Sequence, residues 1–124
     1  MGGLVGLRAV RGATRLEVDD PEHMRERVVE LVNEMLERNE LTTEDLVSVI
    51  FTSTPDLRSD FPAAAARSLG LGDVPLICAQ EIDVAGALTS VVRVLAHAET
   101  DRPRAEVVHV YLRGAEVLRT DLAQ

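Results

Sequence analysis

The sequence has no lysine or tryptophan and a single cysteine, and aromatic residues make up only 2% of its 124 positions. With one cysteine, Cys78, an internal disulfide is excluded, and we expect the chain to work in a reducing cytoplasm. No apolar run approaches the roughly 18 residues that a membrane-spanning helix needs, and the N-terminus has no signal-peptide pattern. We therefore expect no membrane partner.

Positive charge is also scarce, because the formal net charge is −8 and all 13 basic residues are arginine. Domains that bind nucleic acid are usually basic, so we expect no nucleic-acid partner. Any anion site must be built from guanidinium groups, which bind carboxylates as a bidentate fork. The length predicts one domain, residues 1–124, with a mobile tail at about 119–124.

Hydrophobic periodicity predicts an α+β domain, a mixed sheet of four or five strands with helices packed on one face. Asp20 and Pro21 form a strong helix start, and Asn39 is a plausible end. The expected order is strand, helix, strand, helix, strand, helix, strand, strand. The strands are expected at 4–10, 46–52, 74–79, 107–112 and 115–118, and the helices at 20–39, 61–67 and, after a turn at 83–86, about 87–95.

The stretch 76–93 combines an apolar strand, a carboxylate and an arginine. The strand ends near Glu81, and the spacing of Leu88, Val91, Val92 and Leu95 predicts a helix with one apolar face. Arg93 then lies at the edge of that face, where a desolvated guanidinium needs an anionic partner. The residues leave two uses open: Glu81 and Arg93 pair structurally, or both are held for a polar, anionic ligand.

Other chemistry-bearing residues stand in no recognised catalytic setting. Cys78 lies in an apolar strand, where a low thiol pKa is not expected. His23, His97 and His109 have no metal-ligand spacing, and no phosphate-binding loop is present, so we expect neither a metal nor a cofactor. The remaining inventory suits binding of a small polyanion, with catalysis by placement of charge. It consists of Glu81, Tyr111 and four arginines at element ends: Arg11, Arg67, Arg93 and Arg119.

Several separated motifs together resemble one known family. They are RAVRGAT at 8–14, TPDL at 54–57 followed by FPA at 61–63, VP at 74–75 leading to CAQEIDV at 78–84, and HVYL at 109–112 with AEVLR at 115–119 and DL at 121–122. In this order they resemble the small trimeric bacterial chorismate mutases, the AroH class. The resemblance implies the Bacillus-type chorismate mutase fold, assembled as a homotrimeric pseudo-barrel with an active site in each cleft between subunits.

The resemblance also implies an activity and residue roles. The family rearranges chorismate to prephenate, on the route to phenylalanine and tyrosine, without a cofactor. Arg93 is then expected to reach the ether oxygen whose bond breaks, and Glu81 to accept from the ring hydroxyl near the Cys78 backbone. Arg11 and Tyr111 are expected to hold the side-chain carboxylate. The wall is expected to be formed by Phe61, Ala63, Leu76 and Ile77, and the mouth by Arg67, Leu118 and Arg119.

One position departs from the family pattern. Ala64 stands where some members carry lysine, so one positive charge is absent from the cleft and Arg67 or Arg119 is expected to cover for it. The alternative function is a non-catalytic trimeric protein that binds an aromatic-pathway metabolite. Retention of both Arg93 and Glu81 favours the enzyme, because a binding protein has no need of a charge facing the ether oxygen.

Overall fold

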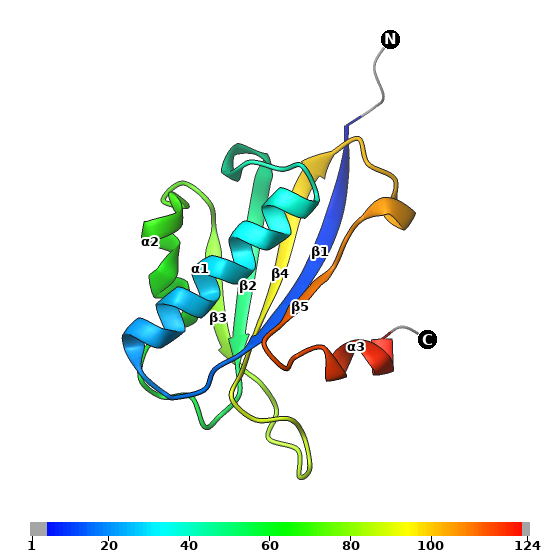
Figure 1. Cartoon of the computed structure of the whole chain (residues 1–124). Helices are drawn as coiled ribbons and strands as arrows, with labels where there is room; N and C mark the ends of the chain where they lie inside the picture. The colour runs from blue at the N-terminus through cyan, green and yellow to red at the C-terminus, as the bar shows by residue number, and fades with distance from the viewer. Residues whose placement is uncertain (1–4, 123–124) are drawn as a thin grey trace.

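The computed structural model describes residues 5–122, and its centre is a five-stranded sheet in the order β3-β2-β4-β1-β5 (Figure 1). The strands are β1 (Gly6–Arg15), β2 (Leu46–Ser53), β3 (Leu76–Gln80), β4 (Val91–Thr100) and β5 (Val110–Leu112). The helices are α1 (Pro21–Arg38), α2 (Ala66–Leu69) and α3 (Val117–Leu122), and short 3₁₀ turns are η1 (Thr43–Asp45), η2 (Pro62–Ala65) and η3 (Arg104–Glu106).

Helix α1 begins and ends where the sequence predicts. The Asp20 side chain accepts a hydrogen bond from the backbone N–H of His23 at 2.9 Å, and Pro21 takes the first helical position. Asn39 ends the helix, and its side-chain amide donates to the Met35 carbonyl at 2.8 Å. The apolar stripe is buried against the sheet: Met24, Val28, Leu31, Val32 and Met35.

The helix expected at about 87–95 is wrong, because residues 91–100 form the central strand β4. This strand pairs antiparallel with both β1 and β2. Val91 and Val92 face opposite sides of the sheet and neither is exposed. A strand buried on both faces has a nearly continuous apolar run. In such a run the spacing of Leu88, Val91, Val92 and Leu95 also matches the apolar stripe of a helix, which explains the wrong prediction.

The sheet is mixed, as predicted, because β1 pairs parallel with β5 and β2 pairs parallel with β3. Helices α1 and α2 cover one face (Figure 1). Strand β1 continues to Arg15, beyond the expected end at residue 10. The strand expected at 115–118 is wrong, because a turn leads into α3, which overlaps the start of the expected tail as far as Leu122. The start of the first expected strand, Leu4, and the tail residues 123–124 lie outside the described residues.

The opposite face of the sheet is mostly uncovered by residues 5–122. Leu88 and Leu118 cover one corner of it, by packing against Ala13, Val91, Tyr111 and Ala115. Elsewhere large apolar side chains remain exposed, with Leu7 at 57% and Ile77 at 60%. We call this surface the open face.

Gly12 in β1 is in close contact with α1, so we expect Gly12→Ala to destabilise the fold. A Cβ atom at Gly12 would overlap the sulfur of Met35 and lie 3.1 Å from Cδ1 of Leu31. Overpacking of this kind costs about 1–3 kcal/mol, softened here by the flexible methionine. Denaturant unfolding measures the change. Gly72→Ala is the control, because a Cβ there meets nothing within 4 Å, and equal stability of the two variants would contradict the prediction.

Candidate active site

Strand register brings Glu81 and Arg93 together with a third residue, Thr52. Thr52 on β2 and Arg93 on β4 are direct cross-strand partners. Glu81 follows the end of β3, and its backbone N–H donates to the Ser53 carbonyl at 2.9 Å. The Glu81 carboxylate oxygen Oε2 accepts from Nε of Arg93 at 3.0 Å and from the Thr52 hydroxyl at 2.7 Å. Glu81 and Arg93 therefore form an ion pair, and the contact is compatible with both of the uses that the sequence left open.

The ion pair leaves part of the Arg93 guanidinium group available. The bond uses Nε, and within residues 5–122 no other polar contact of this side chain is found. The Arg93 side chain is 42% exposed and that of Glu81 17%. A partly exposed pair of this kind contributes about 1 kcal/mol or less to stability, so stability alone does not account for it.

Arg93 lies at the edge of a hollow of about 300 Å³ on the open face. We call it the β1–β4 hollow; its lining residues are Arg11, Gly12, Ile50, Thr52, Arg93, Val94, Leu95 and Tyr111. Three of the predicted site residues, Arg11, Arg93 and Tyr111, therefore meet here. Two guanidinium groups over an apolar floor can hold an anionic ligand of small size.

His109 fixes the backbone of Arg11 at this hollow. The backbone N–H of Arg11 donates to Nδ1 of His109 at 2.9 Å. Burial lowers the pKa of His109, and the positive charges of Arg11 and Arg119 lower it further. A neutral imidazole can accept this bond, and it adds no charge to the two arginines. Leu118 packs beside Tyr111, so the start of α3 brings Arg119 to the same region.

The other predicted residues lie together at the β3 edge of the sheet. A hollow of about 540 Å³, here the β3-edge hollow, is lined by seven residues, all of them predicted: Phe61, Ala63, Ala64, Arg67, Leu76, Ile77 and Cys78. It shares no lining residue with the β1–β4 hollow. Because β3 is one edge of the sheet and β1 lies near the other, one protomer holds the predicted site as two separate halves.

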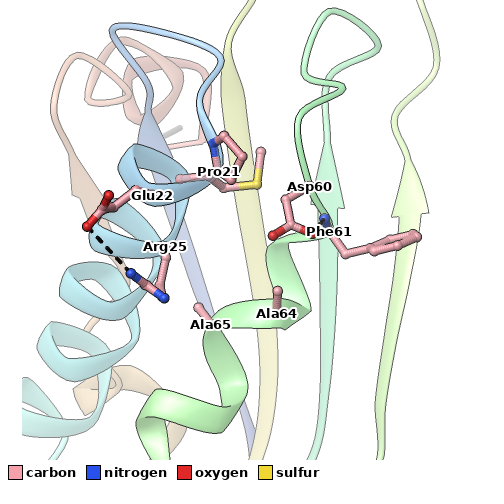
Figure 2. A pocket seen from close by; sticks show the side chains of 8 residues that line it. Pro21, Glu22, Arg25, Asp60, Phe61, Ala64 and Ala65 are labelled. Atoms are coloured by element: carbon pink, nitrogen blue, oxygen red, sulfur yellow. Dashed lines mark hydrogen bonds and ion pairs between the residues drawn. The ribbon is translucent and has the colours of Figure 1, made fainter.

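A third, smaller hollow of about 200 Å³ lies between the start of α1 and η2 (Figure 2). Its charged residues include Glu22 and Arg25, which form an ion pair at 3.7 Å. The Phe61 ring points away from this pair in Figure 2, so its aromatic surface is left for the β3-edge hollow. Two carboxylates, Glu22 and Asp60, line the third hollow against one arginine, so it offers little to an anion.

Sequence reasoning missed Thr52 and His109. Thr52 could not be found because its link to Arg93 depends on the pairing of β2 with β4, and residues 91–95 were assigned to a helix. His109 precedes the predicted carboxylate ligand Tyr111 by two residues, and that spacing in a strand was a usable signal.

Residues 5–122 hold no group of three or more His, Cys, Asp or Glu side chains placed to bind a metal ion. Among the same residues, no helix is long and apolar enough to cross a membrane.

Comparisons with known proteins agree with the geometry. The family described as Chorismate mutase type I matches residues 7–122. Chorismate mutase AroH of Thermus thermophilus is 50% identical over 117 residues, 94% of this chain and 96% of the relative. Chorismate mutase AroH of Bacillus subtilis is 41% identical over 118 residues, 94% and 93% of the two chains. A solved chorismate mutase from Clostridium thermocellum superposes with a TM-score of 0.87 at 42% identity, covering 89% of this chain and 98% of that one.

Proposed function

This chain belongs to the chorismate mutase type I family, and from that premise we propose that it rearranges chorismate to prephenate in clefts shared by neighbouring copies of itself. Its activity is that of an isomerase in aromatic amino acid biosynthesis. The observation that carries the proposed mechanism is the Arg93 guanidinium group, held by Glu81 at 3.0 Å beside a hollow of ligand size.

The reaction is intramolecular: an ether C–O bond breaks as a C–C bond forms within one molecule. No external nucleophile or base is required, which is consistent with the absence of a recognised nucleophile from the sequence. The protein has to hold a compact conformer and stabilise the negative charge that develops on the ether oxygen. We assign the second task to Arg93, which Glu81 and Thr52 orient before substrate arrives.

Substrate carboxylates are the proposed ligands of the remaining positive charges. Arg11 and Tyr111 line the same hollow as Arg93 and are assigned to the side-chain carboxylate. Arg119 shares the electrostatic environment of His109 with Arg11, which supports its place at the mouth. Arg67, on α2, supplies positive charge to the β3-edge hollow, where Ala64 offers none.

A homotrimer accounts for both the divided site and the open face. Each protomer would bring its β1–β4 hollow against the β3-edge hollow of a neighbour, which closes a ring of three equivalent heterologous contacts. The exposed apolar side chains of the open face, such as Leu7 and Ile77, would be buried between sheets. A cytoplasmic location is part of the same proposal and is consistent with the single free cysteine.

Loss of the ultraviolet absorbance of chorismate on addition of purified protein tests the activity, and NMR identifies prephenate, because the mass does not change. Native mass spectrometry tests the assembly, with an expected mass of roughly three times 13.5 kDa. Binding of chorismate without conversion would instead indicate a metabolite-binding protein.

A further inference from the structure

The loop between β3 and β4 is joined to the end of β2 at both of its ends. At its start, Glu81 bonds to Ser53 through the backbone. At its end, the Thr54 N–H donates to the Val91 carbonyl, and the Val91 N–H donates to the Thr54 hydroxyl, both at 3.0 Å. Thr54 is buried, so these bonds fix where β4 begins.

Ser90, the residue immediately before β4, has a left-handed backbone with φ +61°. This conformation is uncommon for a residue with a Cβ atom and needs support from its surroundings. Asp56 supplies it: Oδ2 of Asp56 accepts from the Ser90 backbone N–H at 3.0 Å and from the Ser90 hydroxyl at 3.0 Å. The Ser90 carbonyl accepts from the Leu16 N–H at 2.8 Å, so both sides of the residue are held.

The Asp56 carboxylate is ionised in this arrangement. Burial acts to raise the pKa of Asp56, but hydrogen bonds from the Thr54 side chain and from the backbone and side chain of Ser90 outweigh it, and the pKa is lowered. Hydrogen bonds to a charged acceptor are also stronger than neutral ones.

The backbone direction at Ser90 affects the position of Arg93, because Arg93 lies three residues further along the chain, on β4. Val91 and Arg93 alternate with Val92 and therefore face the same side of the sheet. Val91 is fully buried against Ala13 and Tyr111. A change of backbone direction at Ser90 would displace Val91 from this cluster and move the Arg93 guanidinium relative to the hollow.

We propose that Asp56 is a positioning residue for Arg93, because its two hydrogen bonds hold Ser90 in the conformation from which β4 begins. The proposal rests on the role assigned to Arg93 above. In this proposal Asp56 acts on Arg93 through the backbone of Ser90, and no contact with substrate is assigned to it.

Asp56→Ala is expected to lower kcat about 10- to 100-fold while KM changes less than about twofold, because small displacements of a catalytic group slow the chemical step. Asp45→Ala is the matched control. Asp45 also bonds through Oδ2 to the backbone N–H and hydroxyl of one residue, Thr42, but far along the chain from Arg93. An unchanged kcat in Asp56→Ala, or an equal loss in Asp45→Ala, would overturn the proposal.

A double-mutant cycle separates positioning from general damage. If Asp56 acts through Arg93, then adding Asp56→Ala to Arg93→Ala should change kcat less than about threefold, although it has a large effect in the wild type. Equal losses in both backgrounds would mean that Asp56 acts independently of Arg93. If Asp56→Ala does not fold, the same cycle is run with Asp56→Asn, which still offers an oxygen to the Ser90 N–H.

NMR gives a readout that does not depend on activity. The Nε–H signal of Arg93, identified by its loss in Arg93→Lys, should shift or broaden in Asp56→Ala and remain unchanged in Asp45→Ala. An unchanged signal in Asp56→Ala would overturn the positioning role, whatever the protein catalyses. Conversely, a shifted signal in a protein that does not convert chorismate would support positioning while the proposed function fails.

Discussion

Arg93→Ala is expected to lower the turnover of chorismate by at least about 10³-fold, the effect of removing a preorganised donor from a developing negative charge. The Arg93 side chain lies at the edge of the β1–β4 hollow, and its Nε is already bonded to Glu81. The guanidinium group therefore needs little reorganisation when charge moves onto the ether oxygen. The rate of loss of chorismate absorbance, measured with purified variant, gives kcat and KM separately.

Stability should change little in the same variant. The Arg93–Glu81 pair is partly exposed, and pairs of this kind contribute about 1 kcal/mol or less. Arg38→Ala is the matched control, because Arg38 bonds to Glu34 at 2.7 Å with a similar exposure of 45%, on the solvent side of α1. Both variants should unfold at similar denaturant concentrations, and only Arg93→Ala should lose activity.

The size of the remaining activity decides the mechanism. Arg93→Lys keeps the charge but loses the planar fork that can bond Glu81 and substrate together, so it should remain badly impaired. Near-normal turnover in folded Arg93→Ala would remove the proposed mechanism and leave substrate conformation as the main source of rate enhancement.

How much of this site could be predicted depended on whether the information was local. Helix α1 was predictable because its cap at Asp20, its first-position proline and its apolar stripe all lie within 20 residues. Strand β4 was not, since its burial on both faces comes from β1 and β2, which lie far away in the sequence. Because Arg93 was assigned to a helix, its neighbours could not be predicted. In the sheet they are Thr52 and Ala13, its cross-strand partners.

Naming candidate site residues did not require the correct elements around them. Motif resemblance named Arg93, Glu81 and Arg11, although Arg93 had been assigned to a helix and Arg11 to the turn after its strand. It could not name Asp56 or Ser90 as supports, because their contact joins positions 34 residues apart and depends on the left-handed backbone at Ser90. Local sequence motifs therefore named candidate site residues, while the contacts that fix their side chains depend on strand pairing.

Mixing two inactive variants is expected to restore activity if each site is shared between subunits. Arg93→Ala removes the donor of the β1–β4 hollow, and Arg67→Ala removes the arginine that lines the β3-edge hollow. We expect Arg67→Ala alone to lose about 10²-fold in kcat/KM, since a charge-assisted contact to a substrate carboxylate is worth roughly 2–3 kcal/mol. The two defects lie in different halves of the site.

The recovered activity can be predicted from random assembly. In a trimer formed from equal amounts of the two variants, an interface is intact when the first subunit carries Arg93 and the second carries Arg67. That combination occurs at about one interface in four, so co-refolded protein should show about 25% of wild-type activity. Separately refolded and then briefly mixed samples should show none of this recovery if subunits exchange slowly.

A second pair of variants gives the control that makes the result specific. Arg11 and Arg93 line the same hollow. In a mixture of Arg11→Ala and Arg93→Ala, every subunit therefore carries one defect in its own β1–β4 hollow, and no interface is intact. This mixture should stay inactive. Equal recovery in both mixtures would contradict the divided site. Recovery in neither mixture would mean that one protomer supplies both halves, because defects in different hollows complement each other only in a cleft between subunits.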